Sequence, residues 1–297
     1  MPGTTLEKAA TYTDPTTGAL SMVFQFEHVM LDNGPTGRYD PKPWPWLEYK
    51  ENVTRWQKGI GKGWNSLYFE NHDQPRSVSR MGDDSPRFRE ASAKTLATVL
   101  HMQRGTPYVY QGQELGMTNY PFEAEVDFRD IETLGYLHQA LRMGTPLEAV
   151  LPGLARGSRD NARTPMQWDS GVNAGFSETG PWLAVNPNAA EINVAAQLVD
   201  PDSVFHHYRR LIQLRHDDKV VQLGEFEMLF PDDERLVIFT RTWGEGQLLV
   251  LANVTSEPVR LPLGLPDHGA CEVVIGTHEV DDVDMLAPWE SRIVRLS

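Results

Sequence analysis

Residues 66–76 read SLYFENHDQPR, and this stretch decides the fold class. Its strand-forming start leads directly into an acid, an imidazole, a second acid and a guanidinium: Glu70, His72, Asp73 and Arg76. In parallel α/β folds, ligands bind beyond the carboxyl ends of the strands, so this polar cluster is placed for chemistry. The same residues fit a helix-capping turn with surface charges equally well, and spacing alone leaves both interpretations open.

Short apolar runs on either side repeat the strand pattern. Residues 22–26 and 108–110 are the other strand candidates. The helices are predicted over residues 46–60, from an N-cap at Ser85 and a first residue Pro86 to a stop at Gly105, and over residues 203–216. Strands that alternate with helices predict an α/β fold with a parallel sheet.

The pattern of apolar residues changes near residue 222, where the helical periodicity stops. After it, β-rich runs at residues 236–241, 247–252, 271–275 and 291–296 are separated by Pro, Gly and Asp. This spacing predicts a small antiparallel β-domain. We therefore divide the chain into residues 1–222 and residues 223–297.

Residues 111–202 form an excursion far longer than the usual two to six residues of a βα loop. We expect a helix at 131–142 and a turn-rich stretch at 157–165. The acidic residues at 127–132 favour the helix dipole and need no ligand. The glycines of 111–116 indicate a tight turn at the rim of a pocket.

The run 159–169, RDNARTPMQWD, has two interpretations. Arg159 and Arg163 beside Asp160 fit a salt-bridged loop, which is the commoner outcome. A carbohydrate site would use the same groups to bind hydroxyls, with Trp168 as an apolar wall.

Composition narrows the partners. The chain has 41 Asp and Glu against 27 Lys and Arg, a net charge of −14, which argues against nucleic acid and anionic membranes. No apolar run approaches the roughly 20 residues of a membrane span. The nine histidines show no metal-ligand spacing, so we expect no metal. The single cysteine, Cys271, excludes a disulfide framework and favours the cytoplasm. A small neutral polar partner fits best.

Three motifs together resemble the α-amylase superfamily of retaining glycoside hydrolases, glycoside hydrolase family 13. They are residues 66–76, residues 106–119 (TPYVYQGQELGMTN) and residues 160–169 (DNARTPMQWD). Within the superfamily, the chain is most similar to oligo-1,6-glucosidases and maltase-type α-glucosidases. The resemblance implies a partial (β/α)8 TIM barrel, strands six to eight with their helices, followed by an all-β C-terminal sandwich domain.

The resemblance also assigns roles to single residues. Asp73 matches the family carboxylate that grips the 2- and 3-hydroxyls of the cleaved sugar and helps distort it towards an oxocarbenium-like transition state. His72 would bind the same sugar, Arg159 its outer hydroxyls, and Glu132 would lie beside the leaving sugar. No cofactor is implied.

Retaining glycosidases need a nucleophile and an acid/base about 5 to 5.5 Å apart. In relatives the acid/base Glu stands in a Gly-Glu-Met-Pro-Gly context, and this chain begins Met1-Pro2-Gly3. We therefore expect a fragment that lacks the acid/base Glu and the nucleophile Asp and is inactive alone. Three strands cannot close a barrel, and strands six and eight would expose open edges.

The implied function is that of an α-glucosidase that cleaves terminal α-glucosidic bonds of short isomalto- or malto-oligosaccharides, or sucrose. The alternative is a non-catalytic carbohydrate-binding protein, or one half of a split enzyme. Such a half would keep Asp73, His72 and Arg159, while a partner supplies the missing N-terminal half of the barrel.

Overall fold

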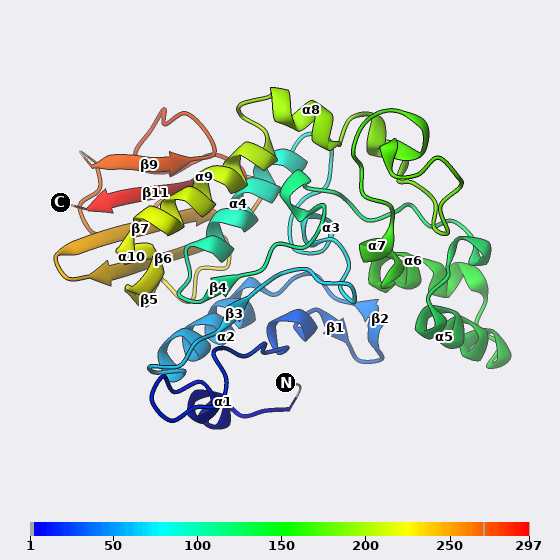
Figure 1. Ribbon diagram of the computed structural model, residues 1–297, viewed down its shortest axis with the longest axis horizontal. Coiled ribbons are helices and arrows are strands. Elements are labelled where there is room, and N and C mark those ends of the chain that lie inside the picture. The colour runs from blue at the N-terminus through cyan, green and yellow to red at the C-terminus, as the bar shows by residue number, and fades with distance from the viewer. Residues whose placement is uncertain (1–2, 270, 297) are drawn as a thin grey trace.

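The computed structural model describes residues 3–269 and 271–296, an α/β part followed by an all-β part (Figure 1). The α-helices are α1 (Leu6–Tyr12), α2 (Trp46–Gly59), α3 (Ser77–Arg80), α4 (Arg89–His101), α5 (Ile131–Arg142), α6 (Leu147–Gly157), α7 (Asp160–Arg163), α8 (Val194–Val199), α9 (Val204–Asp217) and α10 (Lys219–Leu223). The strands are β1 (Asn33–Gly34), β2 (Gly37–Pro41), β3 (Ser66–Leu67), β4 (Thr106–Pro107), β5 (Glu225–Leu229), β6 (Leu236–Trp243), β7 (Gly246–Asn253), β8 (Val259–Arg260), β9 (Glu272–Gly276), β10 (Met285–Leu286) and β11 (Ser291–Leu296). Short 3-10 helices lie at His28–Met30, Gln113–Leu115, Glu125–Asp127, Val172–Gly175 and Pro187–Ala190.

The parallel part is smaller than predicted. β3 pairs with β4 in parallel, and Val23 forms a parallel bridge to Asn65 just before β3. The predicted strand 22–26 is therefore reduced to Val23, and the predicted strand 108–110 is wrong, because β4 lies two residues earlier. The N–H of Tyr108 still donates to the carbonyl of Leu67 at 2.8 Å. Pairing then stops, since the chain after β3 enters the polar turn.

The long helices follow the predictions closely. α2 and α9 begin and end within one residue of the expected bounds, and α5 matches its range, with Asp130 as the N-cap. α4 is the exception, because it begins at Arg89 and not at Pro86. The carbonyl of Ser85 accepts the N–H groups of Phe88 and Arg89, so residues 85–88 form a turn before the helix.

Residues 147–163 are more helical than predicted. α6 ends at Gly157, and residues 160–163 of the expected turn-rich stretch form α7. The glycines of α6 serve close packing and not a turn. A Cβ on Gly153 would lie 2.0 Å from the carbonyl oxygen of Tyr39, and one on Gly157 would lie 2.4 Å from that of Arg38. β2 can therefore press its backbone against this helix.

The all-β C-terminal part is confirmed, with strands in the order β5-β6-β7-β11-β9 in one antiparallel sheet. Successive side chains of β6 point to opposite faces of this sheet, and both faces are buried. Val237 and Phe239 pack with α4 and α9, whereas Leu236 and Ile238 pack with the β8–β10 pair, which is the second layer. β9 begins at Glu272 and not at Cys271.

The predicted boundary at residues 222 and 223 falls inside α10. This helix contacts both α9 and β6. The division of the chain into residues 1–222 and 223–297 therefore stays a prediction. None of the helices in the described residues is long and apolar enough to cross a membrane.

A buried cation joins the two parts. Lys50 of α2 is fully buried, and its Nζ donates to the carbonyl oxygens of Phe230, Asp233 and Leu236 at 2.9, 2.6 and 3.1 Å. These three carbonyls belong to the segment between β5 and β6 and to the start of β6. Burial lowers the pKa of Lys50 to about 8. The ammonium thus caps carbonyl groups that have little access to water.

We expect Lys50→Met to lower the free energy of unfolding by about 3 kcal/mol, because it leaves buried carbonyls without a donor. Urea denaturation followed by circular dichroism measures this loss. Lys58→Met on the exposed side of the same helix is the matched control, with an expected change within about 0.5 kcal/mol. Equal effects of the two substitutions would contradict the role given to Lys50.

Candidate active site

The charged cluster after β3 divides into two pairs with different surroundings. Glu70 and Arg76 point inward, with Arg76 Nη1 3.3 Å from Glu70 Oε2 and both side chains 1% exposed. Glu70 also accepts the backbone N–H of Ser77 at 2.7 Å and its hydroxyl at 2.6 Å. His72 and Asp73 reach the surface instead, with side chains 73% and 38% exposed. The capping interpretation therefore holds for Glu70, but the charges of Glu70 and Arg76 are buried and not on the surface. A chemical role of His72 and Asp73 stays a prediction.

Arg76 fixes the carboxyl ends of the strands relative to one another. Its Nη1 donates to the carbonyl of Gln111, after β4, at 2.6 Å, and its Nε donates to the carbonyl of Asn161 in α7 at 3.1 Å. The turn at 111–116 is confirmed, because Gly112 and Gly116 have φ angles of +87° and +62°. A Cβ on Gly112 would lie 2.3 Å from Met117 Sδ. The turn therefore requires glycine on both counts.

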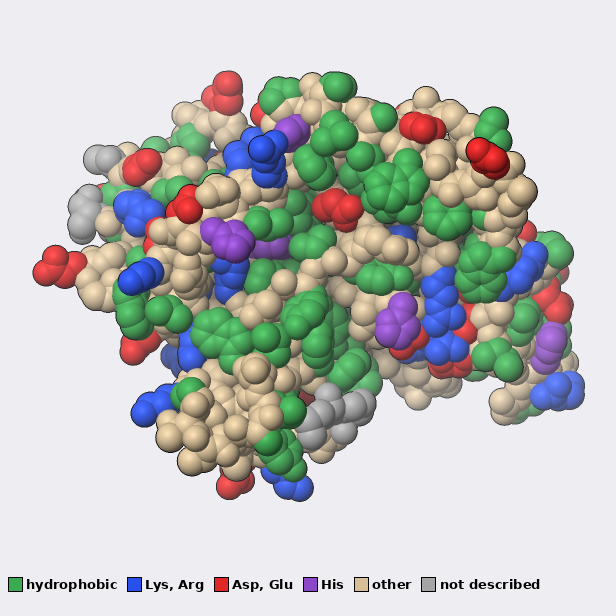
Figure 2. Space-filling model, in the orientation of Figure 1, with side chains coloured by type: hydrophobic (Ala, Val, Ile, Leu, Met, Phe, Trp, Pro, Cys, Tyr) green, Lys and Arg blue, Asp and Glu red, His purple; other side chains and the backbone are tan. Residues whose placement is uncertain are grey.

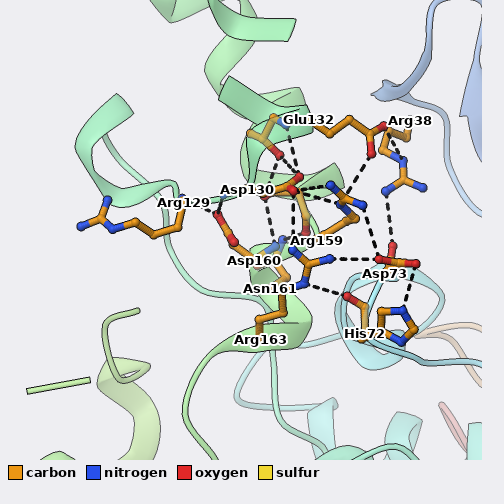
Figure 3. A network of polar contacts seen from close by, with 12 residues as sticks. Arg38, His72, Asp73, Arg129, Asp130, Glu132, Arg159, Asp160, Asn161 and Arg163 are labelled. Carbon is orange, nitrogen blue, oxygen red and sulfur yellow. Dashed lines mark hydrogen bonds and ion pairs between the residues drawn. The ribbon is translucent and has the colours of Figure 1, made fainter. Parts of the chain in front are cut away.

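Asp73 lies at the centre of the exposed cluster. Its Oδ1 is 3.0 Å from Arg163 Nη2 and 3.5 Å from Arg159 Nη1, and its Oδ2 is 3.2 Å from His72 Nε2. Figure 3 shows the two arginines between Asp73 on one side and Asp130 on the other. The carboxylate therefore lies against two guanidinium groups and still exposes part of its surface.

Asp130 anchors the arginines from the opposite side. It caps α5, is 2% exposed, and its Oδ1 lies 2.5 Å from Arg159 Nη2 and 3.5 Å from Arg163 Nη1. Burial alone would raise the pKa of Asp130, but hydrogen bonds from Arg159 and Thr133 outweigh burial and hold the pKa below its ordinary value. The Asp130 carboxylate thus holds both guanidinium groups in place.

α7 is oriented by two buried polar side chains. Asp160 Oδ2 accepts the backbone N–H groups of Arg129 and Asp130 at 2.7 and 2.8 Å. Asn161 Oδ1 accepts the N–H of Tyr120 at 2.9 Å. The predicted salt-bridged loop is therefore wrong in two respects: Arg159 and Arg163 pair with Asp73 and Asp130 and not with Asp160, and residues 160–163 form α7.

Glu132 and Arg38 complete the cluster. Arg159 Nε lies 3.5 Å from Glu132 Oε2, and Arg38 Nε lies 3.8 Å from Glu132 Oε1. Arg38, on β2, also donates to the backbone carbonyl of Asp73 at 3.3 Å. The structure thus brings together all four predicted site residues, Asp73, His72, Arg159 and Glu132, although their roles stay predictions.

Sequence reasoning missed two members of this cluster, Asp130 and Arg38. Arg163 was considered beside Arg159 as a group that could bind hydroxyls, but it was given no role of its own. Asp130 was interpreted only as a dipole-favouring acid, and nothing local marked Arg38. Trp168, the predicted apolar wall, exposes 49% of its surface.

The cluster suits a neutral ligand rich in hydroxyl groups. A carboxylate beside guanidinium groups offers an acceptor and donors side by side, so one hydroxyl can donate to Asp73 and accept from Arg159 or Arg163. Histidine, basic and acidic side chains gather on the surface below α6 and α7 (Figure 2). Within the described residues, no group of three or more His, Cys, Asp or Glu is placed to hold a metal ion.

Comparison with known proteins identifies the family of this chain. The alpha-amylase catalytic-domain model matches residues 1–224. The chain belongs to the α-amylase family. It is 48% identical over 306 residues to an oligo-1,6-glucosidase of Parageobacillus thermoglucosidasius, a match that covers 99% of this chain and 54% of that protein. It is 44% identical over 303 residues to a glucan 1,6-alpha-glucosidase of Streptococcus pneumoniae, covering 99% of this chain and 55% of the relative.

Solved structures superpose closely on this chain, a member of the α-amylase family. The trehalose-6-phosphate hydrolase of Bacillus licheniformis superposes with a TM-score of 0.93 at 37% identity, covering 99% of this chain and 54% of that one. The isomaltulose synthase of a Klebsiella species superposes with a TM-score of 0.92 at 38% identity, with the same two coverages. The chain therefore spans about half the length of the relatives it matches.

Proposed function

We propose that this chain is part of a retaining α-glucosidase that cleaves terminal α-glucosidic bonds of short oligosaccharides. The observation that carries the proposal is Asp73 at the carboxyl end of β3, flanked by His72, Arg159 and Arg163. The relatives named above, an oligo-1,6-glucosidase and a glucan 1,6-alpha-glucosidase, support the same class.

In this mechanism Asp73 accepts hydrogen bonds from two neighbouring hydroxyls of the cleaved sugar. Its negative charge also stabilises the positive charge that develops on the ring in the oxocarbenium-like transition state. His72 and Arg159 bind further hydroxyls of that sugar, and Glu132 lies towards the leaving sugar. Arg163, held by Asp130, positions Asp73.

A retaining glycosidase also needs a nucleophile and an acid/base about 5 to 5.5 Å apart. Asp130 and Asp160 are buried. Both oxygens of Asp130 accept from Arg159 or Thr133, and Oδ2 of Asp160 accepts two backbone N–H groups, while Oδ1 of Asp160 has no partner in the described residues. Glu132 pairs with two arginines. These surroundings suit fixed anions and not a proton donor, so we infer that the catalytic pair comes from outside residues 1–297.

The same proposal extends to the fold. Val23, β3 and β4 lie side by side in parallel, in sequence order, as three consecutive barrel strands would. We assign them as strands six to eight of a (β/α)8 barrel, with the other five supplied from outside residues 1–297. The substrate range comprises isomalto- and malto-oligosaccharides and sucrose.

A second candidate function is supported by the surface beside β4. Tyr108 and Val109 expose 41% and 39% of their surface just after this strand. Large apolar side chains at an open strand edge are suited to a partner. The chain would then be the complementing half of a split enzyme and would hold sugar through Asp73, His72 and Arg159.

A chimera tests the proposed function. The part of the Parageobacillus relative that this chain does not match is fused, in register, to residues 1–297. We expect the chimera to hydrolyse p-nitrophenyl α-glucoside, while the 297-residue chain alone shows no turnover above background. A folded, monodisperse chimera without turnover would overturn the proposal, and turnover by the chain alone would place the catalytic pair inside it. Activity that returns when the two halves are mixed unfused favours the split enzyme.

A further inference from the structure

A groove lies at the junction of the two parts and shares no lining residue with the Asp73 cluster. Its volume is about 720 Å³, which is within the usual range of small-molecule sites. One wall is the C-terminal end of α2 with the turn after it, and the other is the edge strand β5 with β6. α2 runs beneath these strands in Figure 1. A neighbouring hollow of about 420 Å³ shares Glu227 and Thr240 with the groove and extends it to Gln247 of β7.

The groove carries unpaired charges of both signs. Lys58 and Lys62 stand on the α2 wall, and Glu225 and Glu227 stand on β5. All four side chains are exposed. Within the described residues, no side-chain hydrogen bond or ion pair engages any of them. Donors on one wall therefore face acceptors on the other, and both are free for a ligand that lies between them.

The strand wall offers a flat polar surface with an aromatic margin. Glu225 pairs across the sheet with Thr242, and Glu227 with Thr240, so these four side chains lie on one face. Trp243, next to Thr242 but on the opposite face of β6, also lines the groove and is 47% exposed. A pyranose ring has an apolar face that stacks on indole and an equatorial belt of hydroxyls that needs donors and acceptors. The groove presents both.

The opposite wall is fixed before any ligand binds. Arg104 Nη1 and Nη2 donate to the carbonyls of Gly61 and Gly63 at 2.8 and 3.3 Å, and its guanidinium lies 5.3 Å from the centre of the Trp64 ring. The side chain of Gln57 exchanges two hydrogen bonds of 2.9 Å with the backbone of Arg104. The turn that carries Lys62 is therefore held in place, which lowers the entropic cost of binding.

The mixed charge selects against other ligands. A phosphate or other anion would meet Glu225 and Glu227 as well as Lys58, Lys62 and Arg104, which also lines the groove. An added peptide strand on β5 is opposed by the same charged side chains, which typically protect edge strands from pairing. We propose that the groove is a second site that binds a neutral oligosaccharide, independent of hydrolysis at the Asp73 cluster.

Isothermal titration of the 297-residue chain with maltoheptaose tests this second site. We expect Trp243→Ala to weaken binding at least about tenfold, because it removes the stacking surface. Glu225→Gln should weaken binding too, by replacing a charged acceptor. Trp182→Ala is the matched control, since Trp182 is 60% exposed and does not line the groove.

The outcomes separate this proposal from the proposed function. Binding that survives Asp73→Asn and is lost in Trp243→Ala supports the second site, whatever the activity of the chimera. Loss of binding in Asp73→Asn alone would place the sugar in the Asp73 cluster and overturn the proposal. Failure of the unaltered chain to bind maltoheptaose would overturn it as well. Inorganic phosphate that binds more tightly to the Glu225→Gln variant would show an anion site instead.

Discussion

Replacing Asp73 by Asn in the active chimera should lower kcat/KM by about 10³-fold or more while leaving the fold intact. The amide keeps the size of the side chain but removes the negative charge that stabilises the developing oxocarbenium ion. It also replaces one acceptor oxygen of the carboxylate by a donor. A loss of this size corresponds to about 4 kcal/mol of transition-state stabilisation, as expected for a preorganised charged group.

Stability measurements separate this effect from a structural one. The Asp73 side chain is 38% exposed, so we expect Asp73→Asn to change the free energy of unfolding by less than about 1 kcal/mol. Asp160→Ala is the contrasting variant, because Asp160 is fully buried and alanine cannot accept the N–H groups of Arg129 and Asp130 that donate to Asp160 Oδ2. It should lower stability. An Asp73→Asn chimera with more than a tenth of the original kcat/KM would contradict the role of Asp73.

Local sequence signals predicted the parts of the fold that they encode strongly. α5 and β11 occupy their expected ranges, because amphipathic period and turn residues mark both ends. α6 and α7 were missed, since glycines that usually signal turns here allow close contact with β2. The strand at 108–110 failed because strand length depends on the neighbour, and β3 ends at Leu67.

The site residues also divide into those that a local sequence pattern marks and those that depend on contacts between distant elements. His72 and Asp73 were predicted because they lie beyond the carboxyl end of a strand, where parallel folds place ligands, and because they match a family motif. Asp130 and Arg38 come from elements distant in sequence, and their roles depend on how α5 and β2 pack against α7. No local pattern marks such residues, so only the assembled structure identifies them.

Acid should unfold this chain steeply, because three buried histidines resist protonation. Burial lowers the pKa of His28 and of His101 to about 4, and that of His207 to about 3. His101 Nδ1–H donates to the carbonyl of Ala97, and His207 Nε2 bonds to Thr98 Oγ1. The second nitrogen of both rings, His101 Nε2 and His207 Nδ1, is buried without a partner in the described residues. A proton there would have no acceptor.

The direction of the pH dependence follows from these lowered pKa values. The unfolded chain takes up protons on these rings below about pH 6.5, whereas the folded chain does not until about pH 4 or lower. Stability is therefore complete above pH 6.5 and falls as the pH drops towards 4. Three such groups together contribute a slope of up to about 4 kcal/mol per pH unit, which is large against a typical stability of about 5–15 kcal/mol.

Neighbouring histidines on α9 provide the decisive comparison. His207→Gln should remove about a third of the slope contributed by the three histidines between pH 6 and 4.5, measured by urea denaturation at each pH. His206→Gln, at the more exposed neighbouring position on the same helix, should keep the full slope. The comparison uses slopes and not absolute stabilities, because His207→Gln also disturbs the bond to Thr98. A slope that His207→Gln leaves unchanged, or an imidazole NMR signal of His207 that titrates near pH 6.5, would show that this ring is charged in the folded chain.

Because α4, α9 and the five-stranded sheet share one apolar core, protonation of His207 or His101 would act on the contact between the two parts of the chain. Acid is therefore expected to loosen that contact.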